Sequence, residues 1–277
     1  MRTILFVFIL SLVISVQAQD GFVFSGRITG DDGTPVEYAS IGVPGKNIGT
    51  FTATDGTFSL LLPAGVSDTL HISHVSYEAV KIPAALLQQR DTVIAMQAKG
   101  LSEVVIYNGK KKKAELAGNG MRIPGAATMW SVGSIGCEIG SVIETKRVFE
   151  VQEIRFKIRS NRVTGAKMSV NIYKADESTG NFLNTLYTPV YVDIPLSDKK
   201  QEVGIEVTRP IVIEPGRYFV SIMFIDYDRD SISDTEESGR IYFPLYMKQS
   251  YIRNGVMEEL DPIPVNMGLV IKGYEYL

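Results

Sequence analysis

Residues 48–62 read IGTFTATDGTFSLLL, a stretch in which two strand-like runs flank a tight-turn signal. The pair Asp55-Gly56 favours a β-turn because glycine tolerates the positive φ that such turns need. It predicts a hairpin between a strand over Ile48–Thr54 and a strand over Thr57–Leu62. From Phe58 onward, alternate positions of the second strand place apolar side chains on one face. The stretch therefore indicates a β-sheet with one buried and one exposed face.

The same alternation continues on both sides of this hairpin and is interrupted by turn residues at short intervals. A glycine- and aspartate-rich turn is expected at Gly30–Pro35, and the only helical hint is Pro83–Gln89. Further strands are expected at Phe22–Thr29, Val36–Val43, Thr69–Ser73, Glu78–Ile82, Thr92–Ala98 and Leu101–Tyr107. This spacing predicts an antiparallel β-sandwich over residues 21–107.

The second half of the chain shows longer strands with the same two-residue period. Apolar and charged residues alternate through Val148–Arg159, as a strand with one wet face requires. Tyr218–Ile225 is apolar at both parities and is expected to be a central strand covered on both faces. The sequence predicts a second antiparallel sandwich, jelly-roll-like, over residues 126–277, so the fold class is all-β.

A basic stretch separates the two patterned regions. Lys110–Lys113 precede a segment with four glycine or proline residues, and neither alternation continues through it. Residues 108–125 are therefore expected to form a linker. The alternative is that the lysines tether the protein to an anionic lipid or polysaccharide.

The first residues carry an export signal. Basic Arg2 precedes the apolar stretch Ile4–Val16, and Val16-Gln17-Ala18 fits a signal-peptidase site. Residues 1–18 are predicted to be a signal peptide, with no membrane span after its removal. The product is expected in the periplasm, at the outer membrane or secreted. A net charge of −3 over 277 residues gives no field that attracts nucleic acid.

The first region resembles the carboxypeptidase regulatory-like family, a transthyretin-like sandwich common on exported proteins of the Bacteroidetes. The similar residues are Gly26–Thr29, Gly33–Val36, Ala39–Ile41, Gly49-Thr50, Thr54–Phe58 and Leu70–Tyr77. Leu101–Ile106 also resembles the segment that follows this domain in TonB-dependent receptors. The second region is similar to an uncharacterised β-sandwich that follows such domains, and this resemblance implies no activity.

Residues that could support catalysis are sparse. His71 and His74 are the only histidines, and an i, i+3 pair in a strand points to opposite faces. We expect His74 to be packed and His71 to lie at the surface, so the pair does not form a zinc site. Cys137 has no histidine in its own region to generate a thiolate and is expected to be a small buried residue. The sequence therefore predicts a protein that is not an enzyme and has no cofactor.

One acidic loop has the spacing of a calcium-binding loop. Counting from Asp226, carboxylates occupy positions one, three, five, nine and twelve. Against this, Ser231 stands where the loop needs glycine, and the flanking segments are strand-like. A solvated acidic hairpin loop is the alternative. The candidate ligands are Asp226, Asp228, Asp230, Asp234 and Glu237.

These features favour a non-catalytic exported binding or assembly protein of the bacterial envelope, with an envelope protein or a glycan as its partner. The alternative is a glycan-acting hydrolase with a carboxylate site in the second sandwich. Tyrosines and the single tryptophan could form a sugar-stacking platform, although core packing accounts for such residues equally well. They are Trp130, Tyr187, Tyr191, Tyr242, Tyr246 and Tyr251.

Overall fold

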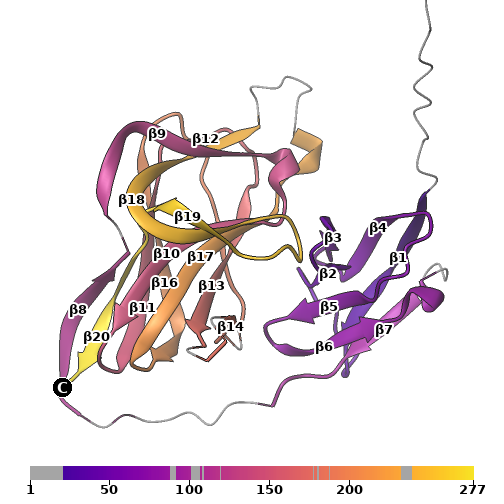
Figure 1. Ribbon diagram of the computed structural model, residues 1–277, viewed down its shortest axis with the longest axis horizontal. Coiled ribbons are helices and arrows are strands. Elements are labelled where there is room, and N and C mark those ends of the chain that lie inside the picture. The colour runs from indigo at the N-terminus through magenta and orange to yellow at the C-terminus, as the bar shows by residue number, and fades with distance from the viewer. Residues whose placement is uncertain are drawn as a thin grey trace, which may run out of the picture.

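The computed structural model describes an all-β protein whose two β-sandwiches lie side by side (Figure 1). The described residues are 21–87, 92–100, 107, 109–118, 120–176, 178–179, 181–186, 188–231 and 239–277. The signal peptide expected at residues 1–18 and most of the strand expected at Leu101–Tyr107 lie outside them. Within these ranges no helix has the length and apolarity needed to cross a membrane.

The first sandwich is built from two sheets. One sheet has the order β4 (Thr57–Pro63), β1 (Gly21–Gly30), β7 (Thr92–Met96). The other has the order β3 (Ile48–Phe51), β2 (Ser40–Val43), β5 (Leu70–His74), β6 (Tyr77–Ile82), and a short 3-10 turn, η1 (Ala84–Leu86), follows β6. The pairing is antiparallel except between β1 and β7, which are parallel.

The core of the first sandwich fills the space between these two sheets. Phe24 on β1 packs against Phe58 on β4, with ring centroids 5.3 Å apart, while Ile41 and Ile72 are fully buried on the opposite sheet. The Asp55-Gly56 turn forms as expected, with Gly56 at φ +78°. However, the hairpin prediction is wrong, because β3 pairs with β2 and β4 pairs with β1. The turn is a corner at which the chain passes from one sheet to the other.

The second sandwich has a four-stranded sheet and a larger curved sheet. The smaller has the order β16 (Gln201–Ile213), β11 (Phe149–Ile158), β20 (Val270–Tyr276), β8 (Lys111–Ala117). The main path of the larger is β12 (Ser160–Asn161), β18 (Arg240–Asn254), β10 (Cys137–Thr145), β17 (Gly216–Asp226), β13 (Lys167–Ala175), β14 (Phe182–Asn184). In addition, β9 (Met121–Ser131) and β19 (Asp261–Asn266) pair with β18, and β15 (Val190–Asp193) pairs with β13.

Strand β17 is central and covered on both faces, as its sequence predicted. Tyr218 and Phe224 point into the core between the two sheets of the second sandwich. Met223 and Ile225 lie on the opposite face and are also buried, in a cluster that includes Tyr38 of the first sandwich. The first sandwich therefore covers part of the outer face of the larger sheet.

The prediction of a linker at residues 108–125 is wrong for the residues of this range that the structure describes, 109–118 and 120–125. Lys111–Ala117 form β8, which pairs along its whole length with β20, and β9 begins at Met121. Ala114 and Leu116 pack against the second core, an alternation that the preceding lysines obscured in the sequence. The second sandwich therefore starts at or before Lys111 rather than at residue 126.

Candidate functional site

The two sandwiches meet along a seam, defined here as the contacts between β2–β3 and its flanks in the first sandwich and β15, β17 and β18 in the second. One part of the seam is aromatic. The rings of Tyr38 and Tyr191 meet edge to face with centroids 5.1 Å apart. The Tyr38 hydroxyl donates to Asp226 Oδ2 at 3.3 Å. Burial, and then the charge of Asp226, raise the pKa of Tyr38, so this hydroxyl keeps its proton.

A second part of the seam is the turn that follows β18, which reaches toward β2 and β3 (Figure 1). Val256 is buried against Gly49, where an added Cβ would stand 2.6 Å from the Val256 Cβ. The Gly45 N–H donates to the Met257 carbonyl at 3.1 Å. Because only glycine leaves room for Val256, residue 49 sets how closely the two sandwiches approach.

Backbone strain in the described residues is concentrated at this seam. The non-glycine residues with positive φ are Tyr38 at 53°, Asn47 at 50° and Met257 at 63°. All three lie in segments that contact the other sandwich. Such conformations persist where the surroundings over-determine them. The seam is therefore a specific, fitted contact.

His74, which was expected to be packed, is partly buried at the same junction between the sandwiches. Its Nδ1 accepts from the Ser76 N–H at 3.2 Å, and its Nε2 is 3.5 Å from the Tyr191 hydroxyl. Burial, helped by the charge of Lys99, lowers its pKa to about 4. Its imidazole is therefore neutral at physiological pH. His71, on the other face of β5, is partly exposed.

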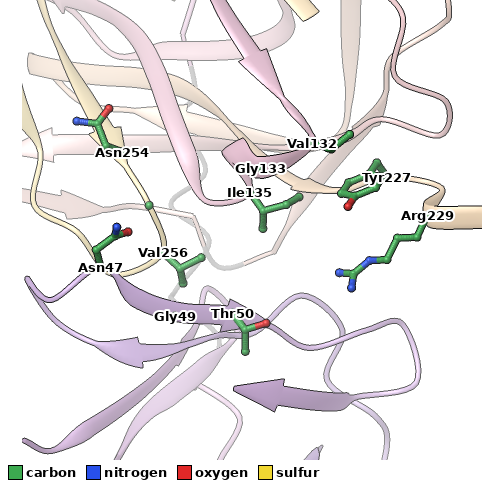
Figure 2. A pocket seen from close by; sticks show the side chains of 11 residues that line it. Asn47, Gly49, Thr50, Val132, Gly133, Ile135, Tyr227, Arg229, Asn254 and Val256 are labelled. Carbon is green, nitrogen blue, oxygen red and sulfur yellow. The ribbon is translucent and has the colours of Figure 1, made fainter. Parts of the chain in front are cut away.

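A cavity of about 440 Å³ opens at the seam (Figure 2). The first sandwich contributes Asn47, Gly49 and Thr50 from β3 and the turn before it. The second sandwich contributes apolar side chains from η2 (Val132–Ser134) and the turn after β18, together with Tyr227 and Arg229. The Arg229 guanidinium lies 5.7 Å from the centroid of the Tyr227 ring. This cavity is the candidate functional site, because it exists only where both sandwiches are in place.

The predicted calcium loop is described only in part. Asp226 is bound by Tyr38, and Asp228 Oδ1 accepts the N–H of Asp230 at 3.2 Å within η3 (Arg229–Ser231). Asp234 and Glu237 lie outside the described residues. In the part of the loop that can be seen, no three acidic side chains lie together as metal ligands. The calcium site therefore stays a prediction.

The sequence did not reveal a buried polar network on the outer face of the larger sheet. Glu138 is fully buried and forms an ion pair with Arg253, whose Nε is 3.2 Å from Oε2. Its Oε1 accepts from Ser221 Oγ at 2.5 Å and from Asn171 Nδ2 at 2.9 Å. The hydroxyl of Tyr173 is 3.3 Å from Oε2. The one available signal was Ser221, a polar residue inside an otherwise apolar strand.

The other candidate side chains do not assemble into a single surface. Trp130 is in the second core, Tyr191 is at the seam, and Tyr251 packs against Phe182, so these rings do not share a platform. Tyr187 lies outside the described residues. Cys137 is half-buried at the edge of the second core, and burial raises the pKa of its thiol, which disfavours the reactive thiolate.

Comparisons with known proteins give a partial sequence relative and a family-model match to residues 24–106. Over 95 residues, the chain is 30% identical to a TonB-dependent receptor of Formosa agariphila. The aligned stretch is 34% of this chain but only 9% of that receptor. A chain of the T13 IBDV viral particle is 11% identical over 96% of this chain and 56% of its own, with a TM-score of 0.27.

A two-domain protein of unknown function from Bacteroides fragilis is 9% identical over 92% of this chain and 96% of its own, with a TM-score of 0.20. At these TM-scores neither structural similarity supports a conclusion. The sequence comparison is more informative, since it agrees with the resemblance seen in the first region. Residues 24–106, which include most of the first sandwich, match the family model of the CarboxypepD_reg-like domain.

Proposed function

We propose that this protein is a non-catalytic binding or assembly protein of the bacterial cell envelope, exported by an N-terminal signal peptide. The CarboxypepD_reg-like domain and the similarity to part of a TonB-dependent receptor support an envelope role. The observation that carries the proposal is the seam, where the two sandwiches are fitted to each other and leave a cavity between them. Its partner is an envelope protein or a glycan.

The alternative, a hydrolase with a carboxylate site in the second sandwich, receives less support. Among the described residues, Glu138 is the acidic residue whose side chain is completely buried. Its oxygens are taken up by Ser221, Asn171 and the ion pair with Arg253. A carboxylate buried and bonded in this way is not open to a substrate, so we favour binding over hydrolysis.

Cell fractionation followed by crosslinking mass spectrometry tests the proposed function. The tagged protein, expressed from its own locus, should be recovered with the envelope fraction and should crosslink reproducibly to one envelope component. Recovery in the cytosol, or turnover of envelope glycans by the purified protein, would contradict the proposal.

A further inference from the structure

The seam cavity has the size and polarity of a small-ligand site. Its volume of about 440 Å³ lies within the range of about 300–1,000 Å³ that such pockets usually have. Val132, Ile135 and Val256 form apolar walls, whereas Asn47, Thr50 and Asn254 provide amide and hydroxyl groups. This mixture suits a compact molecule with both apolar surface and several hydrogen-bonding groups.

The charge of the cavity selects among such molecules. Among the described residues that line it, Arg229 alone is charged. Figure 2 shows its side chain reaching from the second sandwich toward the strand that carries Thr50. A guanidinium presents a planar array of donors that matches a carboxylate.

The cavity is also preorganised on both sides. The contact of Val256 with Gly49 and the hydrogen bond from Gly45 to Met257 fix the distance between the walls. The left-handed backbone at Asn47 and Met257 is held by the same contacts. A ligand that enters therefore does not have to order the walls first, which favours affinity.

We infer that the seam cavity binds a small molecule with a carboxylate, about the size of one or two sugar or amino-acid units. The carboxylate lies on Arg229, and the remaining polar groups bond to Asn47, Thr50 and Asn254. A sugar acid and the C-terminus of a short peptide both present this chemistry. The inference rests on the proposed binding function and names the chemical class of its ligand.

Calorimetric titration of the full-length mature chain tests this inference with two matched pairs of probes. Methyl β-glucuronide is compared with methyl β-glucoside, and N-acetyl-alanyl-alanine with its C-terminal amide. We expect one of the two acids to bind at least tenfold more tightly than its neutral counterpart. The pair that shows this difference identifies the source of the carboxylate.

Two arginine variants locate the binding. Arg229→Gln should weaken binding of the preferred acid at least tenfold, whereas Arg209→Gln, at an exposed position on β16, should leave it unchanged. Failure of both acids to bind, equal binding of acid and neutral probe, or normal binding by Arg229→Gln would overturn the inference. If Arg229→Gln still crosslinks to its envelope partner while neither acid binds, the proposed function stands and only the ligand class fails.

Discussion

At the scale of single residues, His74 couples the stability of the protein to pH. Its pKa is about 4 in the folded protein and about 6.5 when the chain is unfolded. The unfolded chain therefore binds a proton first as the pH falls, and stability present in full above pH 6.5 is lost on acidification. We expect the free energy of unfolding to fall by about 2 kcal/mol from this group between pH 7.5 and pH 5.

Urea unfolding at these two pH values measures the effect. His74→Asn should remove most of the pH dependence. The control is His71→Asn, which should retain most of it, because His71 is partly exposed on the other face of the strand. A wild-type protein equally stable at both pH values would show that His74 is not buried at the seam.

Glu138 is completely buried, although no pattern in the sequence singled it out. Replacing it with alanine leaves the partly buried Arg253 without its counter-ion and removes the acceptor of Ser221 and Asn171. Glu138→Ala should lower the free energy of unfolding by about 3–5 kcal/mol. Glu144→Ala, at an exposed position on the same strand, should change it by less than about 0.5 kcal/mol. Similar values for the two variants, measured by urea unfolding, would refute this account of the network.

At the scale of strands, β8 changes the expected response to proteases. Lys111–Lys113 resemble an open trypsin site, but they belong to a strand paired with β20. Lys111 is further held by an ion pair with Glu150 and lies 4.9 Å from the centroid of the Tyr276 ring. We expect trypsin to spare these lysines under native conditions. The protease must bind the backbone of its substrate as a separate extended segment, whereas the backbone of these lysines is already hydrogen-bonded to β20.

Mass spectrometry of limited digests gives the test. Peptides that end at Lys111, Lys112 or Lys113 should appear only in urea concentrations that unfold the second sandwich. The exposed Lys199 and Lys200, in the segment between β15 and β16, provide an internal comparison in the same digest. Rapid native cleavage within β8 would instead restore the linker interpretation.

The sequence predicted individual strands better than their partners. Alternation located β1, β4 and β11 closely, because one buried face imposes a two-residue period. The same period is satisfied whether two strands pair side by side or face each other across a core. The turn at Asp55-Gly56 was therefore predicted correctly while the pairing of β3 with β4 was not.

The candidate site could not be predicted from local sequence patterns, for a related reason. The bond from Tyr38 to Asp226 joins residues 188 positions apart, and the cavity draws on segments of both sandwiches. The carboxylates were noticed for their spacing along the chain, whereas the structure uses Asp226 as a contact across the seam. Contacts of this kind depend on how the sandwiches dock, which alternation within a strand does not encode.

At the scale of the whole molecule, the seam should make the two sandwiches unfold together. Trp130 is the only tryptophan and lies in the second core, so its fluorescence reports that sandwich alone, while circular dichroism reports both. The two thermal curves should coincide in the wild type. In Gly49→Ala they should separate, because the new methyl group would lie 2.6 Å from the Val256 Cβ and 2.9 Å from its carbonyl oxygen.

Gly100→Ala is the control, since no atom of the described residues lies within 4 Å of the added methyl group. Its two curves should coincide as in the wild type. Coincident curves for Gly49→Ala would mean that the seam does not couple the sandwiches.

The pairing of β8 with β20 also has a consequence for the time course of folding. β8 is the first strand of the second sandwich and occupies the end of its sheet, where β20 is its neighbour. When the chain folds progressively from its N-terminal side, the backbone groups of β8 therefore have no native partner until residues 270–276 follow. Closure of a loop this long is slow compared with formation of a local hairpin. Until β20 arrives, β8 is therefore an unpaired strand, and the charges of its three lysines discourage other chains from pairing with it.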